Sequence, residues 1–231
     1  MSDETVGGTV SGTGEGSAPR ARRSLVVVSA GLSEPSSTRL LADRIAEATV
    51  ARLGDVDQSG ELGSDAGAHV SITVIELREL AHDITNNLLT GFASPKLQEA
   101  LDALAEADGL IAVTPIFTTS YSGLFKSFID VIDPQSLPGL PVLIAATGGT
   151  ERHSLALDYA LRPLFSYLHA VVVPTAVYAA SSDWGTSGNS GASISERIAR
   201  AEGELAALVR NSNRSSEVRD PFALPAGFSP F

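Results

Sequence analysis

Continuous apolar runs alternate with amphipathic stretches along most of the chain. The first run, Leu25–Ala30 (LVVVSA), is rich in β-branched residues, which is typical of a strand buried on both faces. Similar runs predict four further strands, at Val70–Leu77, Gly109–Thr114, Pro141–Thr147 and Ala170–Val173. We expect Pro115 to end the third strand, because proline cannot donate a hydrogen bond to a sheet.

Apolar residues three and four positions apart predict helices between these strands. Ser94 and Pro95 are residue types preferred at the start of a helix. A longer helix, from His153 to Leu168, contains Pro163, where we expect a kink or a restart. Strands that alternate with helices predict an α/β fold: a doubly wound parallel sheet of five strands in three layers, with helices on both faces.

Polar segments predict the limits of the folded domain. The polar composition of residues 1–23 predicts a disordered N-terminal tail, because this segment cannot bury enough apolar surface to offset the entropy of ordering. Residues 24–210 predict one domain, and residues 211–231 a second tail. Within the domain, Gly54–His69 reads as a loop insertion and Ser181–Gly191 as a flexible linker.

The amino-acid composition excludes several classes of function. The 231 residues include no cysteine, which excludes thiol nucleophiles, disulfides, thiolate zinc sites and cysteine-bound iron–sulfur clusters. Redox chemistry would therefore require a bound organic cofactor. The net charge of −11 argues against nonspecific nucleic-acid binding. No apolar run has the length of a transmembrane helix and no signal peptide is recognisable, so we expect a cytoplasmic protein without membrane association.

Ligands of doubly wound sheets bind outside the carboxyl ends of the strands, so the loops there are the candidate site. After the first strand, the hydroxyls of Ser36, Ser37 and Thr38 lie at a helix start, where free N–H groups can hold a phosphate and Arg39 adds charge. Neither a P-loop nor a Rossmann glycine pattern is present. A serine-rich helix cap without a ligand is the alternative.

Two further loops offer a place for a planar ring. Thr114–Lys126, after the third strand, contains Phe117 and Tyr121, although an ordinary lead into a helix with a core aromatic residue is the alternative. Thr147–Thr150, after the fourth strand, contains two glycines that permit close backbone approach, but glycine pairs also occur in simple turns. We expect all three loops to meet at one edge of the sheet.

Three segments, in this order and spacing, resemble the NAD(P)H-dependent FMN reductases of two-component monooxygenase systems. They are TPIFTTSYSGLFKSFIDVID, LPVLIAATGGT and HSLALDYALRPLFSYLHAVVVP. The resemblance is closest to alkanesulfonate-type reductases and to reductases partnered with luciferase-like monooxygenases. It covers about residues 25–178 and implies a flavodoxin-like fold with strand order 2-1-3-4-5.

The resemblance also implies a function. FMN and NAD(P)H would be the cofactors, with hydride passing from the nicotinamide C4 to the flavin N5 and no catalytic side chain. Reduced FMN would then leave for a partner flavin-dependent monooxygenase, and the preference between NADH and NADPH stays open. Two alternatives remain: a quinone, azo-dye or metal-oxyanion reductase with tightly bound FMN, and a flavodoxin-like electron carrier.

The resemblance also implies which residues bind FMN, from their positions in the matching motifs. The resemblance places the first loop at the FMN phosphate, the second beside the isoalloxazine ring and the third at the pyrimidine edge. Many relatives carry an arginine among the serines of the first loop, where this chain has Ser33 and Ser37, and Arg39 is a candidate substitute. The predicted FMN-binding residues are Ser29, Gly31, Ser36, Ser37, Thr38, Thr114, Pro115, Ile116, Phe117, Thr118, Tyr121, Thr147, Gly148, Gly149 and Thr150.

We also expect a homodimer or homotetramer. The helices after the third and fourth strands carry more apolar residues than one core side requires, and these are Phe125, Phe128, Leu164 and Phe165. By resemblance, Tyr121 is an inserted residue that forms a π-helix at a tetramer interface, with an ordinary α-helix as the alternative.

Overall fold

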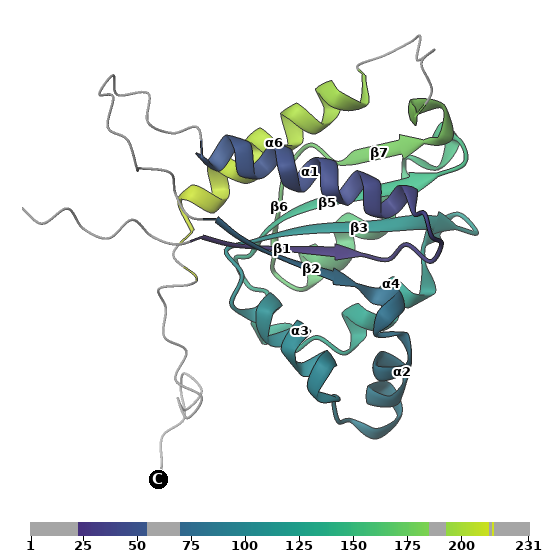
Figure 1. Cartoon of the computed structure of the whole chain (residues 1–231), viewed down its shortest axis with the longest axis vertical. Helices are drawn as coiled ribbons and strands as arrows, with labels where there is room; N and C mark the ends of the chain where they lie inside the picture. The colour runs from purple at the N-terminus through teal and green to yellow at the C-terminus, as the bar shows by residue number, and fades with distance from the viewer. Residues whose placement is uncertain (1–22, 55–69, 185–192, 213, 215–231) are drawn as a thin grey trace, which may run out of the picture.

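A parallel sheet lies between two layers of helices in the computed structural model, which describes residues 23–54, 70–184, 193–212 and 214 (Figure 1). The strands are β1 (Arg23–Ser29), β2 (Val70–Glu76), β3 (Gly109–Phe117), β4 (Ser120–Tyr121), β5 (Pro141–Gly148), β6 (Val171–Val172) and β7 (Val177–Ala180). The α-helices are α1 (Ser37–Gly54), α2 (Ala81–Thr90), α3 (Pro95–Ala105), α4 (Gly123–Asp130), α5 (Arg162–Tyr167) and α6 (Ile194–Arg210). Shorter helical turns are η1 (Leu77–Glu79), η2 (Pro134–Ser136), η3 (Glu151–His153), η4 (Leu157–Leu161) and η5 (Ser181–Trp184).

The sheet has the order β2-β1-β3-β5-β6, with β7 also paired to β5, and all of these pairs are parallel. This confirms the predicted flavodoxin-like order 2-1-3-4-5, with β5 as the fourth strand. The fifth strand is split into β6 and β7 because Pro174 lies between them and has no N–H for the ladder. Arg162 donates instead to the carbonyls of Val173 and Pro174, at 2.9 Å each.

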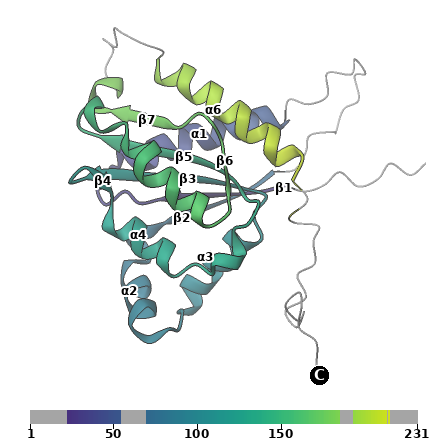
Figure 2. The same cartoon turned by 180° about the vertical axis from the view of Figure 1, so that it is seen from behind.

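Helices cover both faces of the sheet, and each face has its own core. On one face, Leu25 and Val27 of β1 pack with residues of α1 and α6; on the other, Val26 and Val28 pack with residues of α2 to α5. Figure 2 shows the second layer from behind. Since successive side chains of a strand point to opposite faces, the uninterrupted apolar run of β1 supplies both cores. Within the described residues, no helix is both long and apolar enough to cross a membrane.

Several helix boundaries differ from the prediction. Ser94 caps α3 and Pro95 occupies its first turn, as predicted. α2 was not predicted, and Ile84 is its one buried residue. The predicted helix from His153 to Leu168 is divided into η3, the π-helical turn η4 and α5. The restart at Pro163 is confirmed, since it lies in the first turn of α5.

The predicted π-helix at Tyr121 is wrong. Tyr121 belongs to β4, which pairs antiparallel with the end of β3. Ser122 then caps α4, accepting a hydrogen bond from the Phe125 N–H at 3.1 Å, so Tyr121 lies outside the helix. β3 also runs past Pro115 to Phe117, contrary to prediction. β1 pairs with β3 only as far as Val113, so at Pro115 the sheet has β5 on one side alone, where proline is tolerated.

The residues predicted to form a subunit interface are instead part of the core. Phe125, Phe128 and Phe165 are fully buried within the chain, and Phe125 and Phe165 meet edge to face at 6.4 Å. Leu164 packs partly against the same core. These side chains fill the space between the sheet and α4 and α5, so they are not themselves available to a second subunit.

The predicted tails, insertion and linker lie mostly outside the described residues. Ser181–Trp184, placed in the linker by prediction, forms the 3₁₀ turn η5 instead. At the start of the predicted second tail, Ser212 is buried and its carbonyl accepts a hydrogen bond from Arg23. Arg214 donates to the carbonyls of Ser136 and Ala107. The described part of residues 211–231 therefore packs against the domain.

Candidate active site

A cavity of about 410 Å³ opens at the carboxyl ends of β1, β3, β5 and β7. Its volume lies within the range of small-molecule sites, roughly 300–1,000 Å³. The lining residues come from four segments: Leu32, Ser33, Ser36, Ser37, Thr38; Pro115, Ile116, Phe117; Thr147, Gly148, Gly149; and Ser181, Trp184. The structure thus brings the three predicted loops to one edge of the sheet and adds a fourth segment.

The first loop forms the start of α1. The Ser36 hydroxyl accepts a hydrogen bond from the Arg39 N–H at 3.2 Å and so caps the helix. Gly31 makes this possible, because a Cβ there would lie 2.0 Å from Ser36 Oγ. The N–H groups of the first helical turn have no acceptor within the helix and carry a partial positive charge. This end of the cavity therefore suits an anionic group.

A buried hydrogen bond joins the first loop to the end of β5. The hydroxyls of Thr38 and Thr147 lie 2.8 Å apart, and both side chains are almost fully buried. Both residues also line the cavity. The bond holds the start of α1 against the end of β5, so the first and third loops are joined inside the cavity.

The second loop is a tight turn between β3 and β4. Thr118 and Thr119 have positive φ angles of 47° and 72°, and the chain reverses direction there. Thr114 is fully buried, and its hydroxyl accepts a hydrogen bond from the Ser122 N–H at 3.1 Å. The buried Thr114 therefore holds the second loop in place through Ser122, whereas Phe117 of the same loop is partly exposed.

Tyr178 of β7 supports the third loop. Its hydroxyl donates to the Thr150 carbonyl at 2.8 Å, and burial raises the pKa of this tyrosine above its usual value. The phenol therefore remains a neutral donor throughout the physiological range. Gly149 lies beside this contact, and nothing lies within 4 Å of the place where its Cβ would be. The backbone at Gly149 is thus open to a ligand in the cavity.

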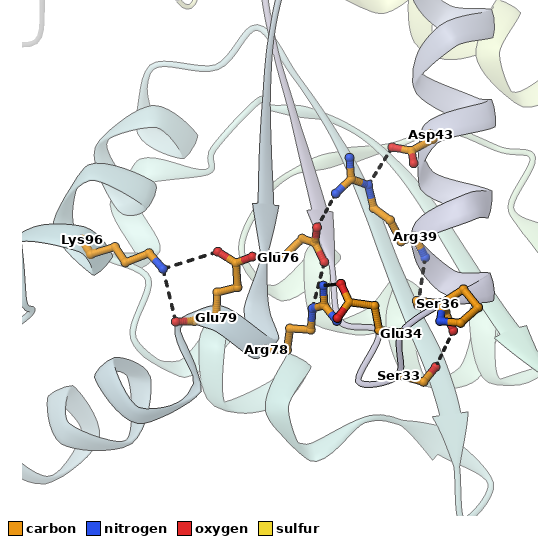
Figure 3. A network of polar contacts seen from close by, with 10 residues as sticks. Ser33, Glu34, Ser36, Arg39, Asp43, Glu76, Arg78, Glu79 and Lys96 are labelled. Atoms are coloured by element: carbon orange, nitrogen blue, oxygen red, sulfur yellow. Dashed lines mark hydrogen bonds and ion pairs between the residues drawn. The ribbon is translucent and has the colours of Figure 1, made fainter.

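Arginines beside the first loop are engaged by carboxylates (Figure 3). Arg39 donates to Asp43 at 2.7 Å and forms an ion pair with Glu76. Arg78 contacts Glu76 at 3.1 Å and Glu34 at 2.7 Å. The hydrogen bond from Arg78, followed by its charge, lowers the pKa of Glu34.

The prediction that Arg39 substitutes for the arginine of relatives is therefore not supported. Arg39 does not line the cavity, and its guanidinium is held by Asp43 and Glu76. The described residues that line the cavity include neither lysine nor arginine. An anionic group there would be held by hydroxyls, backbone N–H groups and the helix dipole.

Most predicted site residues line the cavity, and the rest hold it together or lie beside it. Those outside the lining are Ser29, Gly31, Thr114, Thr118, Tyr121 and Thr150. His153, the first residue of the predicted helix after the fourth strand, is exposed and is also outside the lining. Ser181 and Trp184 were missed, because their segment reads as a flexible linker. The one feature of the sequence that could have pointed to this segment is that Trp184 is the only tryptophan of the chain.

The residues that line the cavity fit FMN. The hydroxyls and free N–H groups at the start of α1 match a phosphate, and the open backbone at Gly149 permits a flat ring to approach. Pro115, Ile116 and Phe117 offer apolar contact to that ring. The fold and the cavity position define a flavodoxin-like α/β protein with a cavity at its topological switch point.

Comparisons with known proteins identify the family. The family of NADPH-dependent FMN reductases matches residues 24–185. A Pseudomonas aeruginosa protein named FMN reductase (NADPH) is 41% identical over 160 residues, which cover 69% of this chain and 78% of that protein. A Pseudomonas putida protein named NADH-dependent FMN reductase SfnF is 39% identical over 155 residues, 67% of this chain and 76% of that protein.

Solved structures agree with this assignment. An oxidoreductase from Corynebacterium diphtheriae is 50% identical, with a TM-score of 0.74 over 83% of this chain and 98% of that chain. A WrbA-like flavodoxin from Agrobacterium tumefaciens is 16% identical, with a TM-score of 0.53 over 83% of this chain and 99% of that chain, and shares the fold alone. The chain belongs to the NADPH-dependent FMN reductase family and is an NAD(P)H:FMN oxidoreductase.

Proposed function

We propose that this protein binds FMN in the described cavity as an exchangeable substrate, reduces it with NAD(P)H and releases reduced FMN to a flavin-dependent monooxygenase. The reaction supplied by the two cofactors is hydride transfer from the nicotinamide C4 to the flavin N5. The observation that carries the proposal is the convergence of a hydroxyl-lined helix start, an apolar strand end and an open glycine on one cavity.

The first loop would hold the phosphate. Ser36, Ser37 and Thr38 provide hydroxyls, and the first turn of α1 provides N–H groups. Ser36 still has its hydroxyl proton to donate, since its contact with Arg39 uses it as an acceptor. With no lysine or arginine in the described lining, the phosphate is held without an ion pair. This supports exchange, because FMN can leave without breaking a charged contact.

The second and third loops would position the ring. Pro115, Ile116 and Phe117 provide apolar contact at the end of β3. Free backbone N–H groups around Gly149 would donate to the pyrimidine edge, where negative charge develops when the flavin is reduced. Tyr178 keeps this loop in place through Thr150. No side chain of the chain is required to transfer a proton.

Release to a partner is supported by the exposed rim. Leu32 and Phe117, which both line the cavity, are about half exposed, so the site opens to solvent. An alternative flavoprotein with tightly held FMN requires a closed pocket. The two relatives named above differ in the nicotinamide named, NADPH in one and NADH in the other, so both should be assayed.

The test is NAD(P)H oxidation by the purified full chain, with and without added FMN. We expect oxidation that requires added FMN and saturates with it, and protein that loses FMN on gel filtration. Oxidation without added FMN by a protein that stays yellow would contradict the exchangeable-substrate proposal. Absence of FMN-stimulated oxidation with either nucleotide would contradict the site itself.

We also propose that copies of the chain associate. Phe125, Phe128 and Phe165 belong to the core, but Leu89 and Phe92 at the end of α2 are about 80% exposed. Exposed large apolar side chains side by side favour a protein contact. Light scattering of the purified chain should give the mass of a dimer or tetramer, and a monomeric mass would refute the proposal.

A further inference from the structure

A fourth segment completes the cavity. Ser181 and Trp184, from the turn η5 after β7, line it together with the start of α1. In Figure 1 the end of β7 lies close to the start of α1, on the face covered by α1 and α6. Trp184 therefore belongs to the same cavity as the start of α1.

The turn is fixed from three directions. Asp183 accepts a hydrogen bond from the Ala180 N–H at 2.8 Å and forms an ion pair with Arg197 of α6. Ser182 donates to Glu151, which follows the third loop, at 3.1 Å. These contacts tie η5 to β7, to α6 and to the loop after β5, so Trp184 is held in place before any ligand binds.

Arg44 of α1 fixes the indole itself. The guanidinium carbon lies 5.0 Å from the centre of the Trp184 ring, which is the geometry of a cation–π contact. Arg44 is exposed, and it lies two helical turns beyond Ser37. The contact holds the indole beside α1, and Trp184 lines the same cavity as Ser33, Ser36 and Ser37.

The indole can contribute two kinds of contact. Its ring covers apolar ligand surface, and its N–H is a donor. Among the described residues, no acceptor for that N–H is found. The described lining offers no charged donor to a phosphate, so a further neutral donor at this end would add directly to its binding.

We propose that Trp184 is an FMN-contacting residue that holds the phosphoribityl end of the flavin against α1. This inference rests on the proposed FMN site. It assigns to η5 a share of the affinity and of the selectivity for FMN over riboflavin, which lacks the phosphate. Arg44 is a positioning residue that acts through Trp184.

The test uses the full chain with Trp184→Ala and Trp184→Phe. We expect Trp184→Ala to raise the Kd and KM for FMN about tenfold, with kcat at saturating FMN little changed. The effect on riboflavin should be clearly smaller. Trp184→Phe keeps a ring without the N–H, so its loss should be intermediate, and this milder variant decides the question if Trp184→Ala does not fold.

Two further variants separate a contact from a structural effect. Arg44→Met removes the cation and keeps an apolar stem, so it should weaken FMN binding less than Trp184→Ala does. Tyr167→Ala deletes an exposed aromatic side chain of α5 that does not line the cavity, and it should leave FMN binding unchanged. Circular dichroism melting curves check that each variant is folded.

The outcomes are distinct. An unchanged FMN Kd in folded Trp184→Ala would overturn the inference, and equal losses for FMN and riboflavin would overturn the placement at the phosphoribityl end. In both cases the wild-type chain would still oxidise NAD(P)H in an FMN-dependent manner. Failure of that wild-type activity would instead reject the proposed function, so the two failures are distinguishable.

Discussion

Gly148 makes room for the hydroxyl of Tyr178. A Cβ at Gly148 would lie 2.0 Å from that oxygen, whereas a Cβ at the adjacent Gly149 would meet nothing within 4 Å. The two glycines of the third loop therefore have different reasons to be glycine. The first is required by the fold, whereas the second lines the cavity and has open space at its Cβ position.

Alanine at these two positions should separate stability from binding. Gly148→Ala should destabilise the fold by roughly 1–3 kcal/mol, because the buried Tyr178 hydroxyl must move and lose its bond to Thr150. Gly149→Ala should leave the unfolding free energy nearly unchanged but raise the FMN Kd about tenfold, since the new methyl group would stand where the ring approaches. Denaturant unfolding and FMN titration give the two quantities.

Adding Tyr178→Phe provides the control for this pair. It removes the oxygen that the Gly148→Ala methyl group meets, so it should restore part of the lost stability in the double variant. If Gly149→Ala binds FMN as tightly as the wild type, the ring does not lie against this backbone, and our placement of the pyrimidine edge is wrong.

A second prediction concerns the bond between the first and third loops. Thr147→Val keeps the side-chain shape but leaves the buried Thr38 hydroxyl without its partner at 2.8 Å. We expect a loss of roughly 1–3 kcal/mol in unfolding free energy and weaker FMN binding, because the helix start is no longer fixed to β5. Both effects can be measured on the same protein sample.

The matched control for Thr147→Val is Thr49→Val. Thr49 is also fully buried in α1, and its hydroxyl donates to the Ile45 carbonyl at 2.8 Å, but it does not line the cavity. This variant should change stability with no change in the FMN Kd. Equal effects of the two variants on FMN binding would mean that the Thr38–Thr147 bond has no special role at the site.

The sheet was predictable from the sequence because each buried strand is a local apolar run. The Leu25–Ala30 run, with both faces buried, needs no knowledge of its neighbours. The end of β3 was not predictable in this way, because past Pro115 the strand continues by pairing with the short strand β4, which gives no apolar run of its own. Helix α2 was also missed, and Ile84 is its single buried residue.

The candidate site was predictable where topology alone determines it. The loops after β1, β3 and β5 meet because parallel neighbours end at the same edge of the sheet. The contribution of Trp184 was not predictable, since it depends on how the end of β7 packs against α1. Sequence position also could not separate Thr114, which fastens the second loop from inside, from Pro115, which lines the cavity.

The last prediction concerns the contact between Arg78 and Glu34 at 2.7 Å, which ties the first loop to the end of β2. Glu34→Gln should loosen the loop that presents Ser33 and raise the FMN Kd by roughly threefold, with little effect on the melting temperature because Glu34 is exposed.

Arg78 lowers the pKa of Glu34, so the tether is fully formed above the pKa of the unfolded state and is lost as the pH falls through the folded-state value. Wild-type affinity for FMN should therefore fall at acid pH, and this part of the pH dependence should be absent in Glu34→Gln. Glu79→Gln, which removes the exposed partner of Lys96 at 3.4 Å, is the matched control and should bind FMN like the wild type. Identical pH profiles for the wild type and Glu34→Gln would show that this tether does not position the loop.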